Sequence, residues 1–259
     1  MISLFRRLRQ KLLIQNRLSR YVIYALGEIF LVVIGILIAL QVNNWNEERK
    51  TKNRERDVLK RLQQEMVQDS LNLESSISLV KYKAEQAERL LRAFEIDSEI
   101  ENPPEFVRDV FLVGRGGSYL PYIPAYNELV ANGELGIIQN EEIIKQISSY
   151  LNRMNGLQSF LYDEGDTRRS VYNAHIHRYF SALIMNEIWE LGTQTEKLTD
   201  DIMESYETDI PGYLSDPDSD YHMRNVAAVN LELKLLYEQS MESFTAPILN
   251  LINQEIDKN

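Results

Sequence analysis

Cysteine is absent from the chain of 259 residues. The chain therefore forms no disulfide, offers no thiol nucleophile and provides no thiolate ligand for a metal. Glycine and proline are sparse, and neither occurs between Gly35 and Pro103. The sustained alternation of polar with Val, Ile and Thr residues that is typical of strands is also missing. These absences favour an all-α protein that contains at least one very long helix.

Charge is distributed unevenly along the chain. The formal net charge is −11, yet residues 1–20 contain no acid and residues 43–61 are net basic, so the acidic excess lies from residue 62 onward. A body this acidic repels phosphate backbones, and we expect no nucleic-acid partner. The basic leader, residues 1–20, adjoins an apolar run, so we expect its side chains to bind anionic lipid headgroups. These side chains are Arg6, Arg7, Arg9, Lys11, Arg17 and Arg20.

The apolar run extends from Tyr21 to Val42 and contains one ionisable side chain, that of Glu28. A helix of this length measures about 33 Å, enough to cross a hydrocarbon core of about 30 Å. The run is too long for a cleavable signal peptide, and no small-residue cleavage site follows it. We predict an uncleaved transmembrane helix over residues 21–43, with the lipid bilayer as a partner. Aromatic residues at its two ends are expected interfacial anchors, namely Tyr21, Tyr24 and Trp45.

We predict a single-pass protein of the inner membrane. Basic residues flank both ends of the run in nearly equal number, but the preceding tail is short and purely basic. This favours a cytoplasmic N-terminus and a periplasmic C-terminal domain. Residues 2–18 either form an amphipathic helix that lies on the inner leaflet or remain a frayed basic tail.

Small and polar residues share one face of the predicted transmembrane helix, and large apolar residues cover the opposite face. Gly35 and Ala39, four residues apart, would allow the backbone of a second helix to approach closely. We therefore expect a homo-oligomer or a membrane-protein partner that packs on this face. The packing face consists of Tyr21, Ala25, Glu28, Val32, Gly35, Ala39 and Val42.

Three interpretations of Glu28 remain open at this point. Its side chain could reach back to the headgroups or be protonated, at a cost of a few kcal/mol. It could form a hydrogen bond or an ion pair with a polar group on a neighbouring transmembrane helix. It could also relay protons in an ion-driven complex, although a single acid is slender evidence for this role.

After the transmembrane helix, the pattern predicts a long amphipathic stalk helix over residues 44–101 and an irregular helical bundle over 104–259. Helices are expected from Glu105 to Val113, from Pro124 to Gly133, and from the N-cap Asn140 past Tyr162, with Gly156 and Gly165 as weak points. Further helices are expected over 181–191, over 199–208, and from Ser219 or Asp220 to about Glu255, with a possible kink at Pro247. Along the stalk, the apolar face includes Ala84 and Leu91, and Asp69 fills a gap in it.

Two clusters have the residue types of a metal site. His175 and His177 are two residues apart, so on a helix they point about 200° apart and cannot share one ion; His175 is more simply a polar surface residue. Asp216, Asp218 and Asp220 resemble the start of a calcium loop, but the glycine and the glutamate that such a loop requires are missing. Turn formation and helix capping explain these acids better, so no metal site is assigned.

No pattern typical of catalysis or cofactor binding stands out. The glycine-rich stretch at residues 114–124 lacks the spacing of a phosphate-binding loop, and no G-x-S-x-G motif accompanies the histidines. The numerous tyrosines fit core and interface packing, with a tyrosine-lined ligand pocket as the lesser alternative. We assign no catalytic residue and no cofactor, and we expect no enzyme.

Two stretches resemble a bacterial domain-of-unknown-function family of short proteins with one N-terminal transmembrane helix. They are GEIFLVVIGILIALQVNNWNEERK, after the basic leader, and AYNELVANGELGIIQNEEIIKQISSYLNRM in mid-chain. The resemblance covers nearly the whole chain and implies no activity, so no functional residue follows from it. We expect a membrane-anchored interaction, scaffold or accessory protein; a ligand-binding sensor that signals through a partner is the alternative.

Overall fold

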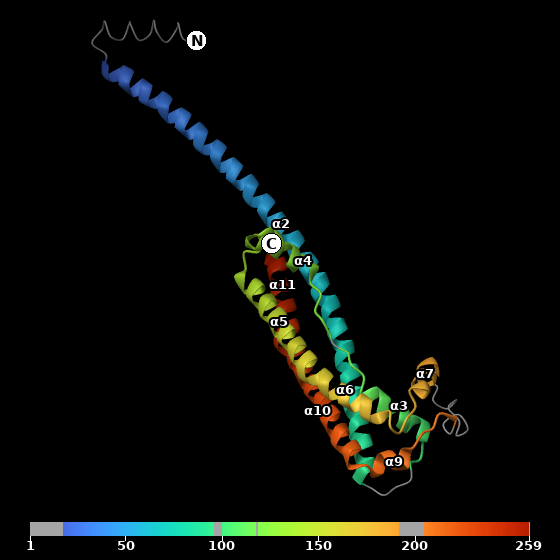
Figure 1. Cartoon of the computed structure of the whole chain (residues 1–259). Coiled ribbons are helices and arrows are strands. Elements are labelled where there is room, and N and C mark those ends of the chain that lie inside the picture. Colours follow the sequence, from blue (N-terminus) through green and yellow to red (C-terminus); the bar gives the residue numbers. More distant parts are fainter. Residues whose placement is uncertain (1–17, 96–99, 118, 192–204, 259) are drawn as a thin grey trace. The chain divides into compact units, whose positions relative to one another are not determined.

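The computed structural model describes residues 18–95, 100–117, 119–191 and 205–258. Every helix or strand element assigned within these ranges is helical, which confirms the predicted all-α class with a long N-terminal helix and a helical bundle (Figure 1). Contacts divide the chain into an N-terminal unit, which ends at Asp57, and a compact unit, Val58–Lys258. The elements are α2 (Leu18–Glu95), α3 (Pro103–Val113), α4 (Pro124–Asn132), η1 (Leu135–Ile137), α5 (Glu141–Phe160), η2 (Leu161–Gly165), α6 (Asp166–Ile176), α7 (Ala182–Leu191), α9 (Ile210–Ser215), α10 (Pro217–Ser240), η4 (Met241–Thr245) and α11 (Ala246–Lys258).

Helix α2 is long because nothing in its sequence stops it. It runs for 78 residues without a break, as expected from the absence of proline and from glycines confined to its N-terminal half. In the compact unit its buried positions recur at intervals of three, four or seven residues, the heptad spacing of a helix that packs against others. From Leu59 onward, the segment predicted as a stalk thus contributes to the core of the bundle. The buried positions are Leu59, Leu62, Met66, Asp69, Leu73, Val80, Lys83, Ala87 and Leu90.

The heptad spacing places Lys83 and Leu90 in the core, one residue before the expected Ala84 and Leu91. Ala84 and Leu91 are half-buried beside them. The prediction chose the apolar residue at each step along the helix. The helical period of about 3.6 residues instead turns Lys83 toward the core.

The helix starts follow local capping chemistry. The Asn102 side chain accepts a hydrogen bond from the Glu105 N–H at the start of α3, and the Asn140 side chain accepts one from the Glu142 N–H at the start of α5, both at 3.2 Å. Helix α4 ends at Gly133, whose φ of 69° is the left-handed conformation that closes a helix. The start of α5 and the end of α4 agree with the predicted ones, whereas α3 begins at Pro103, two residues before the predicted Glu105, because Asn102 is its N-cap.

The C-terminal helices differ from expectation in two places. Helix α10 begins at Pro217, two or three residues earlier than predicted, because Asp216 is the N-cap and proline suits the first helical position. The irregularity near Pro247 is a π-helical turn, η4, that precedes it; Pro247 itself lies in the first turn of α11. A π-turn there accommodates a residue that has no N–H to donate. The predicted helix over 199–208 lies mostly outside the described residues.

Two apolar clusters form the core of the compact unit. The first joins α2 up to Val80 with α4, α5, α11 and the C-terminal half of α10. The second joins α2 from Ala87 onward with α3, α6, α7, α9 and the start of α10. Helix α10 packs along α6, and α11 packs along α5 (Figure 1). Among these helices, α2 and α10 contribute to both clusters.

The left-handed end of α4 gives a test of the fold. Gly133→Ala should lower the free energy of unfolding by about 1 kcal/mol, because a Cβ is disfavoured at positive φ. Gly156→Ala should raise it by about 0.5–1 kcal/mol, because Gly156 is exposed inside α5 and a Cβ there meets no atom within 4 Å. Denaturant unfolding of the full chain in mild detergent, followed by circular dichroism, measures both changes. Effects of the same sign would contradict this difference between the two glycines.

Candidate functional site

The N-terminal unit presents an apolar helical surface that the described part of the chain leaves uncovered. Helix α2 contains one stretch that is long and apolar enough to cross a membrane, and none of that stretch is buried within the protein. Its large side chains are open, with Phe30 64% and Leu31 71% exposed. An exposed apolar surface this large is typical of a segment that is covered by lipid or by another protein.

The predicted packing face lies on this surface. Glu28, Val32, Gly35, Ala39 and Val42 are exposed, whereas Tyr21 and Ala25 are partly buried. A Cβ placed on Gly35 would meet no atom within 4 Å, so the helix backbone is open to approach at that point. Whether a second helix packs there stays a prediction.

The predicted membrane anchors are placed only in part. The side chains of Tyr24 and Trp45 are exposed, and the Arg49 guanidinium lies 5.8 Å from the centre of the Trp45 ring. Arg20 lies in α2, but its side chain is outside the description. The remaining headgroup-binding candidates, Arg6, Arg7, Arg9, Lys11 and Arg17, lie outside the described residues.

In the compact unit, the most unusual feature is an irregular stretch of backbone that connects α3 to α4 and is buried in part, at Gly114, Tyr119 and Ile123. Residues 113–125, hereafter the crossing segment, contain the glycine-rich loop noted in the sequence. Since a buried N–H or C=O without a partner is costly, the surrounding side chains must supply hydrogen bonds to this backbone. They come from α2, α5, α6 and α10.

Carbonyl groups at the start of the crossing segment accept hydrogen bonds from three buried or half-buried side chains. Asn230 donates to the Val113 carbonyl at 3.0 Å, and Asn173 donates to the Gly114 carbonyl at 3.2 Å. The Lys83 ammonium donates to the Arg115 carbonyl at 2.6 Å. Each bond fastens the segment to a different helix.

The later part of the crossing segment is bound to α2, α5 and α10. The N–H of Tyr119 donates to the Tyr237 hydroxyl at 3.1 Å, and the Tyr119 carbonyl accepts from Gln158 at 2.8 Å. The Ala125 N–H, in the first turn of α4, donates to a Glu65 carboxylate oxygen at 2.8 Å. Glu65 thus supplies the negative partner that the start of α4 lacks from its own N-cap, Ile123.

Asp69 is the acidic centre of this arrangement and is 2% exposed. Its carboxylate accepts from the Tyr150 hydroxyl at 2.6 Å and from the Tyr122 N–H at 3.1 Å. The Tyr119 hydroxyl lies 3.0 Å from that of Tyr150 and donates to the Asp69 carbonyl at 3.2 Å. Burial, together with the neighbouring Asp69, raises the pKa of both tyrosines, so both remain protonated donors. Tyr119 and Tyr150 thus pack in the core, and their hydroxyl groups are hydrogen-bonded there.

A layer of buried polar side chains separates the two apolar clusters. Along α2, Lys83 lies between Val80 of one cluster and Ala87 of the other. We call Lys83, Arg169 and Asn230 the polar layer; each is at most 4% exposed. Burial, reinforced by the positive charges of Arg169 and Arg115, lowers the pKa of Lys83 to about 8. The sequence patterns predicted none of these three residues; the signal in the sequence is the position of Lys83, three residues after Val80 and four before Ala87 in the heptad spacing of α2.

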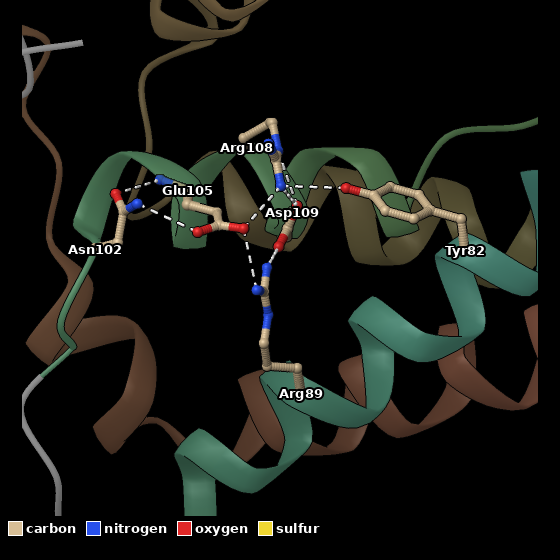
Figure 2. A network of polar contacts seen from close by, with 6 residues as sticks. All are labelled: Tyr82, Arg89, Asn102, Glu105, Arg108 and Asp109. Carbon is tan, nitrogen blue, oxygen red and sulfur yellow. Dashed lines mark hydrogen bonds and ion pairs between the residues drawn. The ribbon is translucent and has the colours of Figure 1, made fainter. Parts of the chain in front are cut away.

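A second ionic network fixes α3 on α2 (Figure 2). Asp109 is fully buried and pairs with Arg89 of α2 and with Arg108, whose nearest nitrogen is 2.7 Å away. Glu105 bridges the same two arginines at 3.1 and 3.3 Å, and its pKa is lowered first by the Arg89 hydrogen bond. Tyr82 of α2 accepts a hydrogen bond from Arg108 at 3.2 Å. Every charge in this network faces an opposite one, which is typical of a structural role.

The histidine interpretation needs one correction. His175 is buried, 6% exposed, instead of being a surface residue: its Nε2 lies 2.8 Å from the Ser219 hydroxyl, and its ring centre lies 4.9 Å from that of His222. His177 lies 3.4 Å from the Phe180 carbonyl. Among the described residues, no group of three or more potential ligands is placed to hold a metal ion.

Two of the three aspartates at residues 216–220, Asp216 and Asp220, have structural partners for their side chains. Asp216 accepts from the Asp218 N–H at 2.9 Å as the N-cap of α10 and from the Tyr179 hydroxyl at 2.5 Å. Asp220 pairs with Arg224 one turn later, at 3.0 Å. Capping and helix pairing account for Asp216 and Asp220, as the sequence analysis favoured.

The Asp69 centre can be tested with a single hydroxyl deletion. Tyr150→Phe should lower the free energy of unfolding by about 1.5–3 kcal/mol, because the buried carboxylate loses a charge-assisted hydrogen bond. Tyr122→Phe is the matched control; Tyr122 is 73% exposed, and a change within about 0.5 kcal/mol is expected. Denaturant unfolding measures both. Equal losses from the two variants would contradict the role of the Tyr150 hydroxyl.

The polar layer predicts a specific pH dependence. Since the pKa of folded Lys83 is about 8, below the value of about 10.4 for an unfolded lysine, the unfolded chain binds more protons between these pH values. The free energy of unfolding of the wild type should therefore rise from pH 7 to 10 relative to Lys83→Met, which lacks this titration. Other groups titrate in both proteins, so the difference isolates Lys83. Parallel pH profiles would contradict its lowered pKa.

The model of a family of unknown function, DUF6090, matches residues 28–154. The match begins within the apolar stretch of α2 and ends within α5, so it includes Asp69, Lys83, the crossing segment and Tyr150. No curated protein and no solved structure matches the chain. The chain is thus similar to an uncharacterised family over the part that contains both the apolar surface and the Asp69 centre.

Proposed function

We propose that the chain is a single-pass protein of the bacterial inner membrane that acts as an interaction, scaffold or accessory subunit and catalyses no reaction. The observation that supports this most directly is the exposed apolar stretch of α2, which is long enough to cross a membrane and has no cover within the described chain. In this topology the basic leader lies in the cytoplasm and the helical bundle lies in the periplasm.

The charged groups in the core of the bundle support a structural role over a catalytic one. The Asp69 carboxylate accepts hydrogen bonds from Tyr150 and Tyr122, and Asp109 pairs with two arginines. Groups that are bonded in this way hold helices in register; a general acid or base instead needs access to a substrate.

The packing face of α2 supports association through the membrane. Lipid tails are as apolar as leucine, so two helices associate in a bilayer through close packing and polar contacts. Gly35 and Ala39 permit that close packing, and Glu28 on the same face supplies a polar group. We propose that a second copy of the chain packs on this face.

Single-cysteine variants test this proposal cleanly, because the natural chain has no cysteine. In native membranes, Ala39→Cys on the packing face should form disulfide-linked dimers on mild oxidation. Leu37→Cys on the opposite face is the matched control and should form few. The full chain should also remain in the membrane pellet after alkaline extraction. Recovery of the chain in the soluble fraction would overturn the membrane assignment, and equal cross-linking at both positions would overturn the packing face.

A further inference from the structure

The polar layer concentrates positive charge inside an otherwise acidic body. Lys83 and Arg169 are each only 4% exposed, and Arg115 lies beside them on the crossing segment. A buried charge without an opposite partner is expensive, so a layer of this kind calls for a compensating group.

The turn at residues 114–117 brings these cations together. Lys83 binds the Arg115 carbonyl at 2.6 Å, which ties α2 to the turn. On the other side, Asn173 of α6 binds the Gly114 carbonyl, and a Cβ on Gly116 would lie 3.9 Å from an Asp166 carboxylate oxygen. Asp166 also pairs with Arg169 at 3.1 Å. The turn, α2 and α6 therefore surround one small region.

The described residues compensate the positive charges of Lys83 and Arg169 only in part. The hydrogen bond of Lys83 is to a neutral carbonyl, and the ion pair of Arg169 is to Asp166, whose side chain is 49% exposed. The Nε of Arg169 is buried and has no hydrogen-bond partner among the described residues. A donor left unpaired at this depth points to a missing acceptor.

The region is also open on one side. Gly116 and Gly117 are exposed, and a Cβ on Gly117 would meet no atom within 4 Å. A small solute can therefore reach the turn without displacing a side chain at these two positions. An oxyanion would supply a negative charge opposite Lys83 and a hydrogen-bond acceptor for the Arg169 Nε–H.

We propose that the polar layer binds a small oxyanion of the phosphate type, held by Lys83 and Arg169 with Arg115 at the entrance. The alternative occupant is a buried water molecule, which would satisfy the Nε donor but leave the positive charge in place. The proposal is independent of the membrane role, because every residue in it belongs to the compact unit.

The test is a titration of the full chain, purified in an uncharged detergent, with inorganic phosphate and with sulfate, against sodium chloride at matched ionic strength. The thermal midpoint of the wild type should rise in a saturable way, by about 5–10 °C at a hundredfold excess over Kd. Calorimetry should give a matching Kd. Lys83→Met should weaken binding at least tenfold.

Lys81→Met is the matched control, because Lys81 is exposed on α2 two residues away; it should bind phosphate as the wild type does. Arg169→Gln is a second test variant in case Lys83→Met does not fold, and it should also weaken binding at least tenfold. A wild-type midpoint that responds equally to phosphate, sulfate and chloride would overturn the proposal and favour the water. Equal phosphate affinity in the wild type and in either test variant that folds would overturn it too.

Discussion

The fold of the compact unit depends on one constraint: an irregular stretch of backbone is partly buried between its helices, and the buried backbone polar groups need partners. In a helix those partners are built in, but residues 114–117 and 119–123, between α3 and α4, form no helix. Side chains from α2, α5, α6 and α10 therefore donate to or accept from this segment. A helix that shifted along its axis would lose these bonds, so the crossing segment fixes the register of the helices around it.

The same constraint explains why the core is divided in two. Apolar side chains alone would allow α2, α6 and α10 to slide against one another, because dispersion contacts are non-directional. The polar layer, Lys83 with Arg169 and Asn230, interrupts the apolar contacts at one level of the bundle. A polar group at a single core position of a helical bundle is known to specify register at some cost in stability.

Local chemistry made the helix ends predictable from the sequence, and tertiary contacts made the polar interior hard to predict. Asn140 as an N-cap and Gly133 as a left-handed C-cap depend on neighbours within four residues, and both predictions are confirmed. Lys83 and His175 depend on residues far away in the sequence. From the sequence, a lysine on a helix is expected to be solvated, but Lys83 faces inward and donates to the Arg115 carbonyl, 32 residues away. His175 is buried against Ser219, 44 residues away. For the candidate sites, the periodicity predicts the packing face of the transmembrane helix and places Asp69 in the apolar face of the stalk, but it cannot predict the partners of either.

Glu28 and Asp69 present the same physical problem in two solvents. Asp69 lies on the apolar face of α2 in the compact unit, and Glu28 lies within the apolar stretch of α2. Each acid needs hydrogen-bond donors if it is to stay charged away from water. Asp69 obtains them from Tyr150 and Tyr122, within the chain. Glu28 is exposed on a surface that the described chain does not cover, so in a bilayer its donors must come from headgroups, water or another molecule. Glu28 has no hydrogen-bond donor among the described residues, and Gly35 on the same face leaves the helix backbone open. Together they are the strongest physical reason to expect a partner on this face.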